Sequence, residues 1–307
     1  MAGLMLLDTP SLYFRAFFGV PESITAPDGM PVNAVRGLLD MTATLVKAHA
    51  PDELVACLDA DWRPAFRVAA IPSYKAHRVA EGDEEQVPEA LSAQIPVIEE
   101  VLDAIGIARV GVPGYEADDV IGTYAARATG PVDVVTGDRD LFQLVDDARP
   151  CRVLYTVRGI RNLQIIDEAQ VTARFGIPGR AYADFATLRG DPSDGLPGVP
   201  GIGAKTAATI VGRYDTWAEL LAAVSDPSDT RMSPNVRTKL AKAADYLAVV
   251  EPVVRVARDA DVVLDRDDTL PVEPADGAKL LELVERWGIG GSVERLLQAL
   301  QNAARSR

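Results

Sequence analysis

Nine acidic side chains stand where predicted strands end or predicted helices begin: Asp8, Asp59, Glu116, Asp118, Asp119, Asp138, Asp140, Asp191 and Asp194. A lone aspartate is usually a solvated surface residue, and an acid in the first turn of a helix commonly caps it. A cap needs one acid, however, and "YEADDV" supplies three. In "TGDRD", Asp138 and Asp140 are two residues apart, so in an extended segment both carboxylates point the same way.

These acids are too many to share one place without cations, because carboxylates a few ångströms apart raise each other's pKa or move apart. Oxygen ligands without histidine or thiolate suit Mg²⁺ or Mn²⁺. The two histidines, His49 and His77, are too far apart in sequence for a zinc site, and the two cysteines, Cys57 and Cys151, are expected to be buried free thiols. Two ions about 4 Å apart could activate a water and stabilise a leaving oxygen in phosphodiester cleavage.

The segment "GVPGIGAKT" is a candidate phosphate site. Its glycines, Gly198, Gly201 and Gly203, let backbone N–H groups approach an anion, and Lys205 and Thr206 begin a predicted helix. The alternative is a plain tight turn between two helices. The segment is not a Walker loop, and no strand precedes it, which excludes a dinucleotide site.

Basic residues gather in "DWRPAFRVAAIPSYKAHR", after the candidate ligand Asp59. A solvated basic face would explain their charge equally well. Beside a phosphodiester-cleaving centre, Lys75 and Arg78 would stabilise charge developing on a phosphate. Tyr74 could stack on an unpaired base, whereas core packing is the preferred role for the aromatic cluster of residues 13–18.

Apolar runs at 4–8, 54–59, 132–138 and 151–155 predict buried strands, and residues 33–50 and 116–129 predict helices. This alternation predicts an α/β fold with a parallel sheet covered on both faces, whose reactive groups gather beyond the carboxyl ends of the strands. From about residue 167, short helices separated by glycine and proline follow.

The amino-acid composition of the 307-residue chain is that of an ordinary globular protein, with 48% apolar residues, and the net charge is −14. No apolar run approaches the roughly 20 residues of a membrane span, and no basic leader is evident, so we expect a cytoplasmic protein. The acidic total is weak evidence against a nucleic-acid partner, because binding depends on where the charges lie.

Four ordered blocks resemble signatures of the 5′-nuclease family, which includes bacterial 5′-3′ exonucleases, the 5′-nuclease domain of DNA polymerase I and flap endonucleases. They are "FRVAAIPSYKAHR", "GYEADDVIGTYA", "VVTGDRDLFQLV" and "LRGDPSDGLPGVPGIGAKTA". The resemblance extends from the N-terminus to about residue 250. Two departures are "DTPS" in place of the usual "DGNS" after the first aspartate, and "SDG" in place of "SDN", which puts Gly195 where an amide is usual.

The resemblance implies a Rossmann-like (PIN-like) domain over 1–175 with a helical arch at about 74–105. It implies a helical domain over 176–307 with a helix-three-turn-helix DNA-binding module at about 184–222. All nine acids would bind two or three Mg²⁺ or Mn²⁺ ions, and Arg67, Lys75 and Arg78 would contact the scissile phosphate. The glycine hairpin would contact duplex DNA and hold a monovalent cation such as K⁺ through the backbone of Val199 and Ile202.

We therefore expect a free-standing, monomeric, metal-dependent nuclease that cuts DNA at a 5′ flap or 5′ end near a duplex junction in replication and repair. One alternative is a structure-selective DNA-binding protein without catalysis, although no acidic ligand appears substituted. The other is a PIN-type ribonuclease, against which the hairpin and the chain length argue.

Overall fold

The computed structural model describes residues 3–80 and 84–305. The strands are β1 (Leu4–Asp8), β2 (Glu53–Cys57), β3 (Ala108–Val110), β4 (Val132–Thr136), β5 (Cys151–Tyr155) and β6 (Gln164–Ile166). The helices up to the last strand are α1 (Thr9–Gly19), α2 (Asn33–His49), α3 (Ala65–Ala70), α4 (Glu89–Ser92), α5 (Ile95–Ile105) and α6 (Ala117–Arg127). The later helices are α7 (Glu168–Phe175), α8 (Tyr182–Arg189), α9 (Ala204–Val211), α10 (Trp217–Ser225), α11 (Pro234–Lys242), α12 (Ala244–Val249), α13 (Glu251–Val254), α14 (Gly277–Trp287) and α15 (Gly290–Arg305).

The six strands form one sheet in the order β3-β2-β1-β4-β5-β6, and only β6 runs antiparallel to its neighbour. The predicted α/β fold is confirmed, as are its four longer strands. The edge strands β3 and β6 were not predicted; each has three residues, which is too short for a recognisable period.

The alternation of side chains along β1 separates two apolar cores. Leu4 and Leu6 face a core that continues through α6 and α8 into the later helices, where it includes Trp217 of α10 and Leu240 of α11. Met5 and Leu7 face a second core built with α1, α2, α5, α14 and α15. Both faces of the strand are therefore buried, which explains why the run "LMLL" has no polar position.

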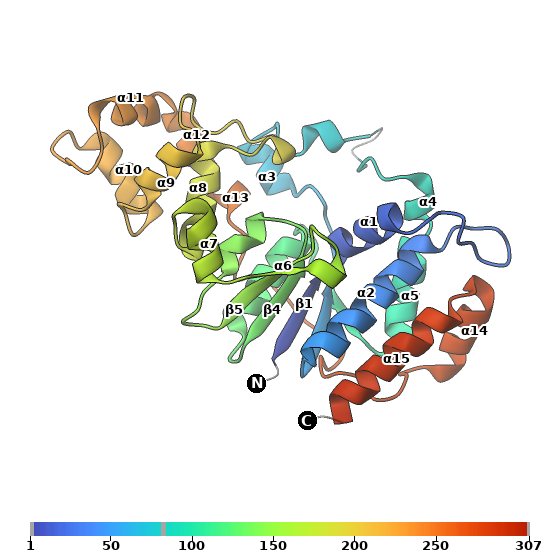
Figure 1. Cartoon of the computed structure of the whole chain (residues 1–307). Helices are drawn as coiled ribbons and strands as arrows, with labels where there is room; N and C mark the ends of the chain where they lie inside the picture. Colours follow the sequence, from blue (N-terminus) through green and yellow to red (C-terminus); the bar gives the residue numbers. More distant parts are fainter. Residues whose placement is uncertain (1–2, 81–83, 306–307) are drawn as a thin grey trace.

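The C-terminal helices α14 and α15 pack on the sheet domain, which corrects the predicted division of the chain into domains. Residues 176–307 were expected to form one helical domain, but α14 and α15 lie beside α2 and α5, away from α9 to α12 (Figure 1). Their buried side chains, including Leu283 and Leu296, complete the second core of the sheet domain. The helical module therefore ends before residue 277.

The expected arch begins as a 3-10 turn, η1 (Ala76–Arg78), and continues in α4 and α5. Residues 81–83 of this stretch lie outside the described part of the chain. The last element, α5, packs Ile98 and Leu102 into the second core, so it is part of the folded domain and not of a free arch. Among the helices of the described residues, none is long and apolar enough to cross a membrane.

Candidate metal and DNA site

The carboxyl ends of three neighbouring strands bring the first acids together. Asp8 ends β1, and its Oδ2 accepts a hydrogen bond of 2.5 Å from Thr136 at the end of β4. The same threonine hydroxyl accepts from the N–H of Asp138, and Asp138 Oδ1 accepts from the N–H of Asp140. Asp59, two residues beyond β2, accepts from the N–H of Ala117, one residue before Asp118. These contacts tie the strand ends and loops that carry the five aspartates to one another, and their joint binding of an ion stays a prediction.

The departure "DTPS" preserves this geometry. Asp8 caps α1 by accepting from the N–H of Ser11, and Pro10 lies in the first helical turn, where no backbone donor is needed. The hydroxyl of Ser11 accepts from the N–H of Gly137 at 2.9 Å. Ser11, the serine that both motifs share, therefore contacts the loop that carries Asp138.

Of the nine predicted ligands, five form no ion pair within the described residues: Asp8, Asp59, Asp118, Asp138 and Asp140. Burial, with a further contribution from the charge of Asp138, raises the pKa of Asp8 to about 6. Burial and then the charges of Asp8 and Asp138 raise the pKa of Asp118 well above its usual value. Burial and the neighbouring acids raise the pKa of Asp140 in the same way. Within the described residues these carboxylates have no direct ion pair, and the more distant charges of Lys75 and Arg139 only partly offset the rise in pKa.

This donor set fits a hard divalent cation, because it consists of oxygen ligands whose mutual repulsion a cation would relieve. As they stand, no three His, Cys, Asp or Glu side chains of the described residues are close enough together to hold an ion.

Asp119 does not fit the predicted ligand set, because all its acceptor positions are used. Its Oδ1 accepts from Arg67 and from the N–H of Ala257, and its Oδ2 accepts from Arg67 and from the N–H of Glu116. The side chain is fully buried. Asp119 is a structural residue, and its assignment as a metal ligand is corrected.

Arg67 is likewise unavailable to DNA. Its side chain is 2% exposed, and its nitrogens donate to Glu116, Asp119 and the carbonyl of Val253. The predicted contact of Arg67 with a scissile phosphate is therefore wrong for this arrangement. The arginine instead joins α3, α6 and α13.

Glu116 and Lys75 form a buried pair. The ammonium of Lys75 lies 2.6 Å from Glu116 Oε1, and the hydroxyl of Tyr74 donates to both oxygens of Glu116. Burial lowers the pKa of Lys75, but the charge of Glu116 and other neighbours outweighs it, so the pKa lies above its usual value. Tyr74 is 3% exposed, which contradicts its prediction as a stacking surface for DNA bases.

Asp194 ends η6 (Pro192–Asp194), the turn after α8, and Asp191 caps the start of that turn. Asp191 is buried: Ser193 donates to its Oδ1, and Arg189 and Arg139 lie 3.0 Å and 3.4 Å from its Oδ2. Asp194 pairs with Arg78 at 3.0 Å through one oxygen only. Burial, then the charges of Asp138 and Asp194, raise the pKa of Asp140, so η6 lies near Asp140.

The glycine hairpin adopts the backbone that its sequence predicts. Gly198 and Gly201 have φ values of +67° and +77°, and Gly203 precedes α9 as its cap. Lys205 is exposed and Thr206 half-buried in the first turn of that helix. Positive charge is therefore available at the helix N-terminus.

Lys239 of α11 is a residue that sequence reasoning missed. Its ammonium donates to the carbonyl of Gly201 at 2.9 Å, which brings a second lysine to the hairpin. The residues are 38 positions apart, and no pattern in the sequence links them. The carbonyl of Val199, an expected cation ligand, accepts from the N–H of Ile202.

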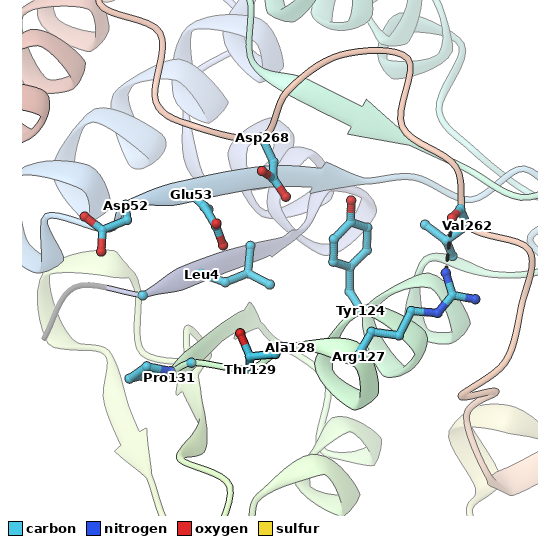
Figure 2. A pocket seen from close by; sticks show the side chains of 12 residues that line it. Leu4, Asp52, Glu53, Tyr124, Arg127, Ala128, Thr129, Pro131, Val262 and Asp268 are labelled. Carbon is cyan, nitrogen blue, oxygen red and sulfur yellow. Dashed lines mark hydrogen bonds between the residues drawn. The ribbon is translucent and has the colours of Figure 1, made fainter.

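A pocket of about 450 Å³ lies at the opposite, amino-terminal edge of the sheet. Figure 2 shows Leu4 and Glu53, the first residues of β1 and β2, beside Asp268 and Tyr124. Arg127 in its wall already donates to the carbonyls of Ala260 and Val262. The pocket is separate from the acids at the carboxyl ends, and none of the predicted site residues lines it.

Two family models together match residues 3–278 of the chain. Residues 3–176 match the family described as 5′-3′ exonuclease, N-terminal resolvase-like domain, and residues 177–278 match 5′-3′ exonuclease, C-terminal SAM fold. A 5′-3′ exonuclease of Streptomyces coelicolor is 62% identical over 96% of this chain and 99% of its own length. One from Mycobacterium tuberculosis is 52% identical over 97% of each chain.

The fold is also similar to that of a solved structure. The bacteriophage T5 D15 flap endonuclease, solved as a complex with DNA and metal ions, superposes with a TM-score of 0.60. It is 15% identical, and the superposition covers 99% of each chain.

Proposed function

Because the chain belongs to the 5′-3′ exonuclease family, and is therefore a phosphodiester hydrolase, we propose that it cuts DNA near a single-strand/duplex junction with the help of Mg²⁺ or Mn²⁺. The observation that carries this proposal is the gathering of five aspartates, without a cationic partner among the described residues, at one end of the sheet. The T5 enzyme with a similar fold was solved with DNA and metal ions, which supports the same substrate and cofactor class.

We assign the metal-binding role to the five unpaired aspartates, with Asp194 as a sixth candidate because one of its oxygens accepts no hydrogen bond in the described structure. Glu116 and Asp191 are proposed to act through the cations that they position, Lys75 and Arg189. When bound, the divalent ions would supply a water of lowered pKa and charge stabilisation for the leaving oxygen.

The chain's own cations are proposed to bind the scissile phosphate. Lys75 uses donors toward Glu116 and the carbonyl of Trp62, which leaves a third N–H for a phosphate oxygen. Arg78 uses one terminal nitrogen toward Ser193 and Asp194, so its other N–H groups are available. Both cations adjoin the acids, where charge develops during cleavage.

We propose that the hairpin binds the phosphates of the duplex through Gly198, Gly201, Gly203, Lys205 and Thr206, with Lys239 as an addition. Potassium at Val199 and Ile202 stays a prediction, and Lys239 already places a positive group on the adjoining carbonyl. Since the site residues all come from one chain, a monomer is expected to suffice. A role in DNA replication and repair in the bacterial cytoplasm stays part of this proposal, and its support is that the similar 5′-3′ exonucleases are bacterial.

A labelled 5′-flap duplex tests the function directly. Cleavage near the junction is expected with Mg²⁺ or Mn²⁺, and a chelator is expected to abolish it, because the carboxylates need a divalent cation to act. A matched flap with an RNA 5′ strand and a fully paired duplex are the controls. No cleavage of any DNA substrate with either metal would contradict the proposal, and exclusive cutting of RNA would favour a ribonuclease.

Neutralising Lys205 is expected to weaken duplex binding and to lower the slope of log affinity against log salt by about 1, because one phosphate contact is lost. Lys205→Ala should leave metal affinity unchanged, since the hairpin holds none of the proposed ligands. Lys47→Ala, in an exposed position near the end of α2, is the matched control. Equal loss of DNA and metal binding in Lys205→Ala would show that the hairpin assignment is wrong.

A further inference from the structure

The backbone of the acidic turn η6 touches the chain just before η1. A Cβ atom placed on Gly195 would lie 2.1 Å from the carbonyl oxygen of Ser73, far inside van der Waals contact. The φ of Gly195 is +72°, a left-handed value that also disfavours a side chain. Only glycine therefore fits at this position, because the backbone of Ser73 occupies the space that a side chain would need.

Three further contacts surround this approach. The hydroxyl of Ser73 donates to the carbonyl of Gly195 at 2.8 Å, and the N–H of Lys75 donates to the carbonyl of Asp194 at 3.0 Å. The guanidinium of Arg78 donates to the carbonyl of Ser193 at 2.7 Å. Ser73, Lys75 and Arg78 thus donate to the backbone carbonyls of residues 193–195, which joins the two segments.

Lys75 has an unusual conformation within this contact. Its φ is +47°, and Ala50 is the other non-glycine residue of the described chain with a positive value. A left-handed lysine is strained and persists when its surroundings determine it. Its N–H bond to Asp194 and its ammonium bond to Glu116 do so from both ends of the residue.

We propose that Gly195 and Ser73 are positioning residues whose contact holds Lys75 in its left-handed conformation, with its ammonium beside the catalytic acids. This proposal deepens the proposed function and rests on it. Gly195 is followed within a few residues by the DNA-binding hairpin, so the contact also joins duplex binding to the position of a cation at the scissile phosphate. A phosphate-binding cation displaced by about 1 Å is expected to cost about 10²-fold in rate.

Gly176 offers a matched control for a substitution at Gly195. Both glycines have φ 72° and ψ 22° and follow a helical turn, but a Cβ at Gly176 would meet nothing within 4 Å. Gly195→Ala and Gly176→Ala therefore share the same conformational cost, and only the first displaces Ser73. The difference between the two variants therefore measures the effect of the contact with Ser73, separately from the cost of the left-handed backbone.

The kcat and KM of both variants are measured on the 5′-flap duplex, well below their melting temperatures. Gly195→Ala is expected to lower kcat about 10²-fold with KM within twofold, whereas Gly176→Ala keeps the wild-type kcat. Equal kcat values for the two variants would overturn the contact's role while leaving the nuclease function intact. Failure of the wild-type chain to cut any DNA would instead overturn the proposed function.

Ser73 provides a second variant that introduces no collision. Ser73→Ala removes the bond to Gly195 and is expected to lower kcat severalfold, and Ser73→Thr, which keeps the hydroxyl on an exposed side chain, is expected to restore it. A merely structural role would change melting temperature without this rescue of kcat. Identical kcat values for the alanine and threonine variants would contradict the proposal.

Discussion

Replacing Asp118 by asparagine is expected to abolish DNA cleavage and to leave the fold intact. The carboxylate of Asp118 has no hydrogen bond or ion pair within the described residues, so an amide of the same shape breaks no contact there. The substitution removes one negative charge from a group of acids whose mutual repulsion already raises its pKa. The protein should therefore unfold at the same temperature or slightly higher.

The loss of activity should be large because a charge that binds a divalent ion is worth several kcal/mol, and each 1.36 kcal/mol is tenfold in rate. We expect kcat/KM on a 5′-flap duplex to fall by about 10³-fold or more. Asp245→Asn, at an exposed position on α12, is the control for loss of one negative charge. Wild-type activity in Asp118→Asn would remove this residue from the ligand set.

Asp118 and Asp119 show which part of the site could be predicted from the sequence and which part could not. Strand ends and the resemblance predicted that acids meet at the carboxyl edge; Thr136 at the end of β4 donates to Asp8 at the end of β1, and joint coordination of an ion by these acids stays a prediction. Two adjacent aspartates at the start of a helix, however, point about 100° apart. Which of them faces the other acids depends on Arg67, 52 residues away, and no local pattern encodes that contact.

The same limit applies to the residues that the sequence misplaced or missed. Tyr74 and Arg67 lie in the segment "FRVAAIPSYKAHR", which was correctly expected to adjoin the acids. Basic and aromatic residues can form either a DNA-binding surface or a buried hydrogen-bonded network, so composition alone did not distinguish the two. Gly195 departs from the family pattern, and only the approach of Ser73 explains why a side chain is absent. Local chemistry was therefore predictable, whereas pairing between distant segments needed the fold.

Asp119→Asn is expected to have the opposite effect, a large loss of stability. Arg67 and the N–H of Ala257 donate to Oδ1, and Arg67 and the N–H of Glu116 donate to Oδ2. Whichever way the new amide turns, its NH₂ faces two donors and leaves them without an acceptor. Removing one partner of a buried ion pair costs about 3–5 kcal/mol in unfolding free energy, because a buried charge is left uncompensated.

Equilibrium unfolding in urea at 25 °C measures this loss, with Asp118→Asn as the neighbouring control of identical chemistry. The network joins α6 to α3 and, through the carbonyl of Val253, to α13, so its disruption should loosen the attachment of the helical module to the sheet domain. Asp119→Asn should remain able to cleave DNA in proportion to its folded fraction, because its oxygens are not among the proposed ligands. An unchanged unfolding free energy together with lost cleavage would reverse the assignments of the two aspartates.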